Sequence, residues 1–198
     1  MKLTSENFYL VGAGGYGKQL EFMLKHDKII SSAKFVDDKH KFKIKNFLKI
    51  NKKIYFSITI SNIKIRESIY NLSKNKNLLY TTLIFPSCNI YSKKISKGCI
   101  IEPNTTIANN VSIGVGNFIF TGTSIGHDTS IGNFCNVGSN VVISGNVNIG
   151  KKVIIGGQSF ISNNLNICSN VVIAPGSVVL SDIKKPGIYN GNILIKSF

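Results

Sequence analysis

The sequence predicts a protein of mixed class, in which a small N-terminal α/β unit precedes a left-handed parallel β-helix of about five coils. Two observations lead to this prediction. An aliphatic residue recurs at every sixth position from Ile95 to Val179, and a glycine-rich turn joins an apolar stretch to a helical pattern near the N-terminus. We expect the α/β unit at residues 1–85, the β-helix at residues 86–183 and a C-terminal tail at residues 184–198.

The first elements are arranged as strand, turn, helix and strand. Residues 8–11 are apolar and predict a short buried strand, which leads into the turn Gly12–Gly17 with the sequence GAGGYG. A helical pattern follows over residues 18–25, and residues 33–36 predict a second strand. This order is the beginning of a Rossmann-like βαβ unit.

The glycine turn predicts a phosphate-binding site. Glycines allow the backbone to approach a phosphate, and the N-terminus of the following helix offers free N–H groups. Asp37 and Asp38 follow the second strand, where carboxylates can accept hydrogen bonds from a ribose or a base. A unit of about 80 residues is too short for a dinucleotide fold with a substrate site, so we expect a mononucleotide such as the UDP of a nucleotide sugar. A purely structural tight turn is the alternative.

The rest of the first unit is less strongly patterned. Residues 39–53 are rich in lysine and predict a surface loop, and residues 54–60 predict a strand. An amphipathic helix is expected over residues 63–72 and a last strand over residues 78–85, and Pro86 marks the junction to the second unit.

The period of six continues without interruption over residues 95–179. All fifteen of its positions hold Ile or Val. Helices repeat every 3.6 residues and strands every two, whereas a period of six is typical of a parallel β-helix with three short strands in each triangular coil. The aliphatic side chains point into the prism and stack into one continuous core. A β-sandwich with this spacing by chance is the rejected alternative.

A second column, mostly of small or β-branched residues, lies four positions after the aliphatic one, and it contains Cys99 and Cys135. These two cysteines therefore predict core packing rather than metal ligation or a disulfide. The four cysteines of the chain show no C-x-x-C spacing. We expect no metal site.

Charge and composition exclude several classes of protein. Residues 1–94 hold 18 Lys and Arg against 6 Asp and Glu, and residues 95–198 hold 6 against 3. The lysines are scattered and not interleaved with aromatic residues, so we expect no nucleic-acid partner, although a basic surface suits phosphorylated ligands. The N-terminus shows no signal-peptide pattern, and apolar stretches are too interrupted to span a membrane. A cytoplasmic protein without membrane insertion is expected.

One residue of the β-helix stands out as a candidate general base. His127 is the only histidine of this segment, and it follows the aliphatic Ile125 by two positions, which places it near an outward-facing corner. Asp128 comes next, and a neighbouring carboxylate favours a basic imidazole. A coil of 18 residues puts Gly145 directly above His127, where a bare backbone N–H can stabilise an oxyanion. The same spacing of 18 residues places Ser139, Gly157 and Pro175 in one column. The alternative is a solvated surface histidine.

The chain resembles a known family at this point. The glycine turn, the segment Phe35–Asp38, the segment Ser61–Arg66 containing Asn62, and the hexads around Gly126-His127-Asp128 follow one another as in the hexapeptide-repeat sugar acetyltransferases. This family includes UDP-4-amino-sugar N-acetyltransferases of the bacillosamine pathway and sialic-acid O-acetyltransferases. The resemblance covers nearly the whole chain.

The resemblance implies a homotrimer that binds acetyl-CoA between subunits and acetylates the amine of a UDP-linked 4-amino sugar. His127 would be the general base and Asp128 its partner. The coenzyme would contact Asn136, Gly145, Gly157 and Pro175. The nucleotide sugar would contact Ala13, Gly14, Gly15, Asp37, Asp38 and Asn62.

The chain departs from the family pattern at three places. Phe120 replaces a frequent Asn, Asn136 replaces a frequent second His, and the tail lacks the usual Gly-x-Pro-Ala. The acceptor sugar is therefore open, with O-acetylation of a sialic-acid-like sugar as the alternative. A β-helix carbonic anhydrase would need three zinc histidines, an ice-binding solenoid would show flat threonine ladders, and a dehydrogenase would need a full dinucleotide fold.

Overall fold

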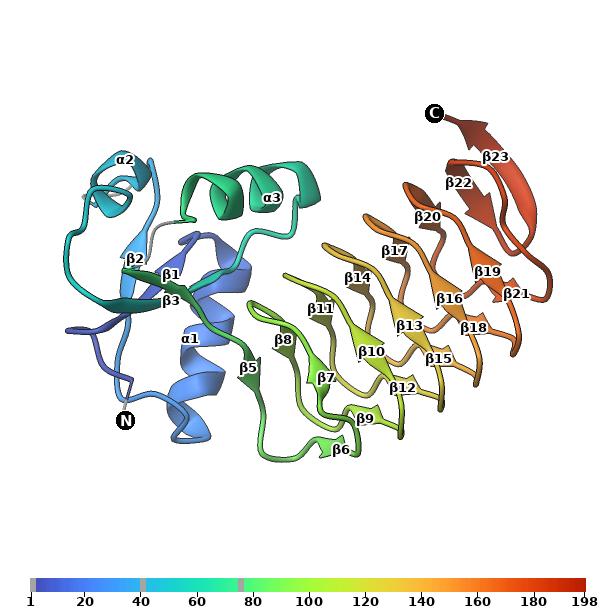
Figure 1. The fold of residues 1–198 in the computed structure, drawn as a ribbon, viewed down its shortest axis with the longest axis horizontal. Helices are drawn as coiled ribbons and strands as arrows, with labels where there is room; N and C mark the ends of the chain where they lie inside the picture. Colours follow the sequence, from blue (N-terminus) through green and yellow to red (C-terminus); the bar gives the residue numbers. More distant parts are fainter. Residues whose placement is uncertain (1–2, 40–41, 75–76) are drawn as a thin grey trace. The chain divides into compact units, whose positions relative to one another are not determined.

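The computed structural model describes residues 3–39, 42–74 and 77–198. The chain divides into two compact units, Met1–Phe85 and Pro86–Phe198. The α/β class of the first unit and the β-helical class of the second agree with the predicted fold (Figure 1).

The first unit is built on a parallel four-stranded sheet in the order β2-β1-β3-β4. Its two central strands consist mostly of apolar residues, and nearly all of their residues are buried, which fixes the sheet as the core of this unit. The strands are β1 (Phe8–Val11), β2 (Lys34–Val36), β3 (Ile54–Ile58) and β4 (Leu78–Tyr80), and the helices are α1 (Gly15–His26), α2 (Ile44–Phe47) and α3 (Ile63–Leu72).

The segment expected as a surface loop contains the short helix α2, and this expectation was wrong. Phe47 of α2 is fully buried, and its ring lies 5.9 Å from the ring of Tyr9 and 5.3 Å from that of Phe56. Because lysines surround Phe47 in the sequence, the composition of this segment does not reveal that the Phe47 side chain is buried. The strand expected over residues 78–85 is also interrupted, since β4 ends at Tyr80 and β5 spans Leu83–Ile84.

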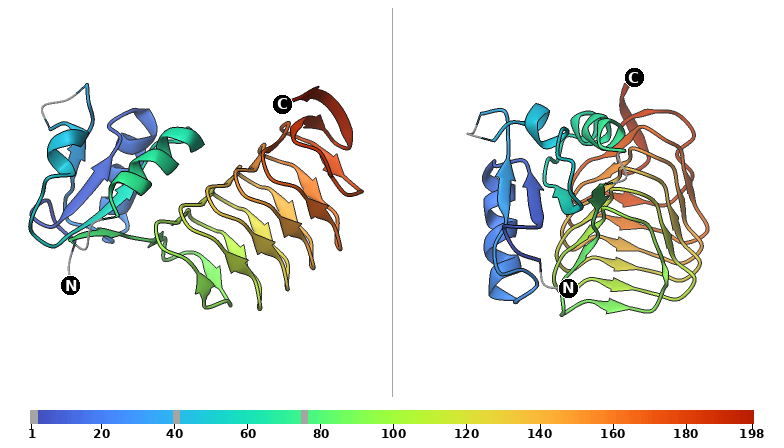
Figure 2. Two further views of the ribbon diagram at one scale, coloured as in Figure 1. Left: turned by 45° about the horizontal axis from the view of Figure 1, so that its top comes forward. Right: turned by 60° about the vertical axis from the view of Figure 1, so that its left-hand side comes forward.

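The second unit is a β-solenoid with three faces, each a stack of short strands (Figure 2). Face 1 contains β8 (Ile100–Ile101), β11 (Phe118–Ile119), β14 (Asn136–Val137), β17 (Ile154–Ile155) and β20 (Val171–Ile173). Face 2 contains β6 (Asn89–Ile90), β9 (Thr106–Ile107), β12 (Ser124–Ile125), β15 (Val142–Ile143), β18 (Phe160–Ile161) and β21 (Val178–Val179). Face 3 contains β7 (Lys94–Ile95), β10 (Ser112–Ile113), β13 (Ser130–Ile131), β16 (Asn148–Ile149) and β19 (Asn166–Ile167).

The stack is taller than the expected five coils, because face 2 holds six strands within the described chain. The extra strand is β6, which pairs Ile90 with Ile107, 17 residues further on, instead of the usual 18. Ile90 also lies only five residues before Ile95. The first coil is therefore one residue short, which removes it from the period of six although it stacks like the others.

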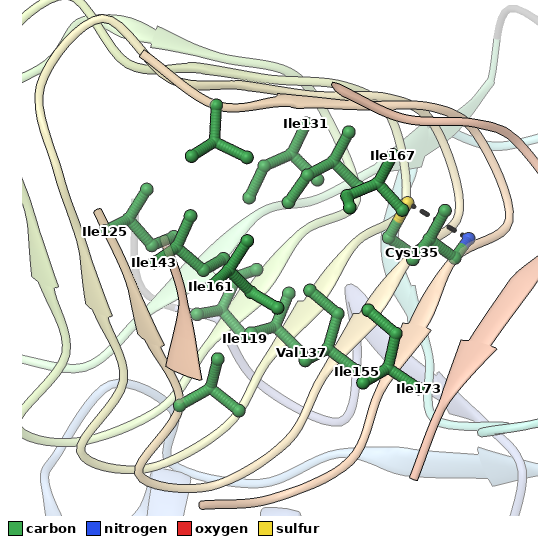
Figure 3. Packing of buried hydrophobic residues seen from close by; sticks show 14 of the residues in the cluster. Ile119, Ile125, Ile131, Cys135, Val137, Ile143, Ile155, Ile161, Ile167 and Ile173 are labelled. Carbon is green, nitrogen blue, oxygen red and sulfur yellow. Dashed lines mark hydrogen bonds between the residues drawn. The ribbon is translucent and has the colours of Figure 1, made fainter. Parts of the chain in front are cut away.

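Three columns of aliphatic side chains fill the interior of the solenoid (Figure 3). Ile125, Ile143 and Ile161 form one such column, and each is at most 1% exposed. Cys99 and Cys135 are buried in the same core as free thiols, which confirms their predicted packing role. A stacked core of this kind fixes each coil relative to the next.

The turns between faces share one backbone conformation. From Gly98 to Gly176 every sixth residue has a positive φ, between 55° and 73°. Glycine and asparagine occupy most of these positions because they tolerate the left-handed region best. Asp128, with φ 58°, occupies one of them.

The segment expected as a C-terminal tail forms a hairpin. Strand β22 (Gly187–Asn190) pairs in parallel with β20, and β23 (Ile193–Ser197) returns antiparallel to β22. Across the described ranges, no helix has both the length and the apolar character that crossing a bilayer requires.

Candidate functional site

His127 and Asp128 lie in the turn that joins face 2 to face 3, between β12 and β13. The inward Ile125 ends β12 and fixes the start of this turn in the core. The positive φ of Asp128 then turns the chain toward face 3 directly after the histidine. The two side chains are 57% and 45% exposed, so the pair faces solvent at a corner of the prism, as predicted.

The imidazole and the carboxylate form a direct hydrogen bond. His127 Nδ1 lies 2.8 Å from Asp128 Oδ2. An ionised carboxylate only accepts hydrogen bonds, so Nδ1 is the donor, and the neutral ring keeps an acceptor lone pair at Nε2. The pair therefore presents a proton acceptor at Nε2.

The pKa of Asp128 is held below its ordinary value. The largest cause is the hydrogen bond from His127, followed by a second hydrogen bond in which Asn110 Nδ2 donates to Asp128 Oδ1 over 3.1 Å. The positive charge of Lys94 acts in the same direction. Each of these interactions favours the ionised carboxylate that the pair requires.

The ring of His127 rests on the glycine of the next coil, which confirms the predicted stacking. A Cβ atom on Gly145 would stand 2.6 Å from His127 Nε2 and 2.8 Å from Cε1, so no other residue leaves the ring in this place. Gly145 is half-buried, and its N–H donates no hydrogen bond within the described chain. A free backbone donor beside Nε2 is the arrangement that an oxyanion requires.

Backbone hydrogen bonds hold the pair from the coil above and the coil below. Asn146 N donates to His127 O over 2.9 Å, and Asp128 N donates to Asn109 O over 3.2 Å. The site is therefore assembled from three successive coils, although the two reactive side chains are adjacent in sequence.

A second His–Asp pair in the chain shows what is particular to this site. His26 Nδ1 lies 2.8 Å from Asp27 Oδ1 at the end of α1, which is the same separation. The ring of His26 stacks on the exposed Phe22, with ring centroids 6.4 Å apart, and among the residues that the structure describes no glycine lies against it. The hydrogen-bonded pair alone does not distinguish a site, whereas the pair beneath an open glycine does.

The predicted coenzyme residues other than Gly145 lie elsewhere on the solenoid. Gly157 stacks between Ser139 and Pro175 as expected, since Gly176 N donates to Gly157 O over 2.9 Å and Ser139 O lies 3.1 Å from the place of a Cβ on Gly157. This column occupies the corner between face 1 and face 2, and Asn136 lies in β14 of face 1 with only 9% of its surface exposed. One chain therefore does not bring these residues to His127.

The glycines of the first unit fall into two kinds. Gly12 has φ +116°, and a Cβ there would stand 2.8 Å from Ile60 and Thr59, while a Cβ on Gly17 would stand 2.1 Å from Gly12 O. These two glycines are required by the fold. A Cβ on Gly14 or Gly15 would meet nothing within 4 Å, and both positions are exposed at the start of α1.

The predicted polar residues of the first unit all support local backbone. Asp37 Oδ2 accepts from Ala13 N over 2.8 Å, which ties the glycine turn to the end of β2. Asp38 Oδ1 accepts from Ile44 N at the start of α2, over 3.0 Å, and Asn62 Oδ1 caps α3 through Ile65 N, over 3.1 Å. All of them follow the carboxyl ends of parallel strands, the usual place of a ligand site in such sheets.

No group of three or more His, Cys, Asp or Glu side chains arranged to hold a metal ion occurs in the part of the chain that the structure describes. The residue that sequence reasoning missed at the site is Asn110. Its signal was present in the sequence, because Asn110 belongs to the column of Asn and Gly residues with a period of six.

The fold is similar to several solved structures. The acetyltransferase domain of PglB from Neisseria gonorrhoeae in complex with acetyl coenzyme A matches with a TM-score of 0.84 at 19% identity, over 98% of this chain and 100% of that chain. PerB from Caulobacter crescentus in complex with CoA and GDP-perosamine matches with 0.81 at 18%, over 92% and 94%. WeeI from Acinetobacter baumannii matches with 0.83 at 19%, over 96% and 99%.

No protein-family model and no curated protein sequence matches the chain. The chain has the fold of these three solved structures along nearly its whole length. At this level of identity the likeness establishes the fold.

Removal of the imidazole tests the electrostatics of the pair. In His127→Gln the largest cause of the lowered Asp128 pKa is lost, so the pKa of this carboxyl rises toward its ordinary value and protonation begins at a higher pH. Carbon-13 NMR of the Asp128 carboxyl across an acid titration measures the shift. His26→Gln is the matched control and leaves the Asp128 titration unchanged; an equal effect of both variants contradicts the assignment.

Proposed function

We propose that the protein transfers an acetyl group from acetyl-CoA to the amine of a nucleotide-linked amino sugar. The observation that carries this proposal is the His127 ring, held at Nδ1 by Asp128 and lying against Gly145 with Nε2 as the proton acceptor. A general base beside an unused backbone donor is suited to acyl transfer.

The reaction proceeds by direct attack in a ternary complex. The amine nitrogen of the sugar attacks the thioester carbonyl carbon while His127 Nε2 takes the amine proton. The oxyanion of the tetrahedral intermediate accepts a hydrogen bond from Gly145 N–H. Its collapse breaks the C–S bond, and the proton on His127 passes to the departing CoA thiolate. The products are the acetamido sugar and free CoA, and no covalent enzyme intermediate is formed.

The first unit is proposed to bind the nucleotide part of the acceptor. A side chain at Gly14 or Gly15 would meet no other atom within 4 Å, so neither the backbone conformation nor the packing requires glycine at these two positions. A phosphate against the turn and the N-terminus of α1 explains both residues. Two structural relatives support the two ligands, since one is in complex with acetyl coenzyme A and the other with CoA and GDP-perosamine.

We further propose a homotrimer with its active sites between subunits. The two predicted halves of the coenzyme site, His127 with Gly145 and Gly157 with Pro175, lie at opposite edges of face 2. Face 2 also carries the exposed apolar side chains of Val142, Phe160 and Val178. When three copies pack around a closed ring, these apolar side chains are covered. The edge of face 2 with His127 in one copy then approaches the edge with Gly157 in its neighbour.

Replacement of the base gives the first test of the activity. His127→Ala should lower kcat about 10²- to 10⁴-fold, the usual contribution of a general base. A thiol-release assay with acetyl-CoA and a panel of UDP- and GDP-linked amino sugars measures the rate, and a parallel panel of sialic acids detects O-acetylation. His26→Ala is the control. Near-normal turnover by His127→Ala contradicts the mechanism.

Substitution of the open glycines tests the nucleotide site. Gly14→Ala adds a methyl group where the structure leaves space, so the fold is retained while the KM for the nucleotide sugar rises about tenfold and the KM for acetyl-CoA stays unchanged. By contrast, Gly12→Ala should destabilise the first unit, because its φ and its neighbours exclude a side chain. Thermal unfolding and steady-state kinetics separate these effects; unchanged sugar binding in Gly14→Ala argues against a phosphate at this turn.

A charged side chain introduced on face 2 tests the proposed homotrimer. Phe160→Asp places a carboxylate within the proposed interface, and we expect a monomer of 21.7 kDa instead of a trimer of three such chains, together with loss of transferase activity. Sedimentation velocity measures the mass. The control Asn148→Asp on the exposed part of face 3 leaves the trimer intact, and a monomeric wild type refutes the assembly.

A further inference from the structure

The turn column that contains Asp128 also contains Asn110, one coil below it. Residues 110, 128, 146 and 164 are spaced by 18, and all four have φ between 58° and 60°. The shared conformation explains why Asn is suited to these positions, but it does not explain the contact that Asn110 makes. Its Nδ2 donates to Asp128 Oδ1 over 3.1 Å, on the side of the carboxylate opposite to His127.

We propose that Asn110 is a positioning residue, which orients the Asp128 carboxylate and thereby fixes the tautomer of His127. This inference rests on the proposed function, since it assigns Asn110 a role in the same site. Asp128 is 45% exposed, so packing does not hold its side chain. The two hydrogen bonds use one oxygen each, and together they fix the plane of the carboxylate.

The orientation of the carboxylate has a direct chemical consequence. With Oδ2 toward the ring, Nδ1 keeps its proton and Nε2 keeps the lone pair that faces Gly145. Rotation of an unanchored carboxylate into water would allow the other tautomer, in which Nε2 carries the proton and cannot accept one. A hydrogen-bond partner of this kind acts through the residue that it orients.

The titratable groups that act on Asp128 are His127, chiefly through its hydrogen bond, and Lys94. Lys94 contributes through its charge and is the weakest of the recorded causes, whereas the Asn110 hydrogen bond is second only to that of His127. Asn110 is therefore the contact from the coil below that a substitution can remove without altering the charge of the site.

Asn164 provides a matched comparison. It has φ 60°, lies two coils above Asp128 in the same column, and its side chain makes no hydrogen bond within the described chain. Glycine accepts the left-handed conformation without strain, so Asn110→Gly and Asn164→Gly remove the same side chain from the same type of turn. Asn110→Asp keeps the shape and replaces the donor by a second carboxylate.

The test begins without substrate, on the full-length protein. Nitrogen-15 NMR of the imidazole reports the tautomer, and carbon-13 NMR reports the Asp128 carboxyl. Wild type and Asn164→Gly should show the Nδ1–H tautomer, and Asn110→Gly a mixture of both. The pKa of Asp128 should rise in Asn110→Gly, where a donor is lost, and further in Asn110→Asp, where a like charge is added.

Kinetics give the second readout. We expect Asn110→Gly to lower kcat about 10- to 100-fold, the size of one hydrogen bond to a charged group, with the KM values nearly unchanged. Asn110→Asp should lose more activity, and Asn164→Gly should lose none. A general loss of folding would instead affect both glycine variants alike.

The outcomes separate this inference from the proposed function. If both Asn110 variants match Asn164→Gly in tautomer, titration and kcat, Asn110 is only a turn residue and the inference is wrong. If the NMR signals change as described while wild type releases no thiol with any acceptor, the orienting contact is supported and the proposed function fails.

Discussion

Every feature of the second unit depends on the stacking of one coil on the next at a spacing of 18 residues. Parallel backbone hydrogen bonds and three columns of aliphatic side chains enforce this spacing. Within the regular coils a residue is therefore placed by its number, because its neighbours in the stack are the residues 18 positions before and after it. At the ends of the stack the spacing changes, to 17 between β6 and β9 and to 16 between β20 and β22. No long-range loop has to be ordered to bring Asn110, Asp128 and Asn146 into one column, because the core already determines their positions.

Residues of the coil below and of the coil above both contact the His127–Asp128 pair. Below, Asn109 and Asn110 bond the backbone and the side chain of Asp128. Above, Asn146 bonds the backbone of His127, and Gly145 leaves the space that the ring occupies. A His–Asp pair on a mobile loop would lose conformational entropy each time a ligand ordered the loop. The pair described here is held by a solenoid that is ordered before any ligand binds.

Much of the fold and of the candidate site could be predicted from the sequence, and both the correct and the missed predictions have physical reasons. The period of six predicted the β-helix, and stacking arithmetic placed Gly145 over His127, since both follow from a regular core. The first coil was missed because Ile90 breaks the period by one residue. Helix α2 was missed because a single buried ring, Phe47, holds it among lysines. Asn110 was missed because its role depends on a side-chain orientation across coils, and the sequence pattern specifies only its column.

The C-terminal hairpin has a consequence for the molecule as a whole. A stack of parallel strands is open-ended, and its last coil offers unpaired N–H and C=O groups to any further strand, including one from another copy. In this chain β22 continues face 1 for one more strand, and β23 then runs in the opposite direction after a register shift between Ile188 and Tyr189. Because β23 reverses the chain direction, a further coil would meet an antiparallel strand on face 1 instead of the parallel template that every earlier coil met.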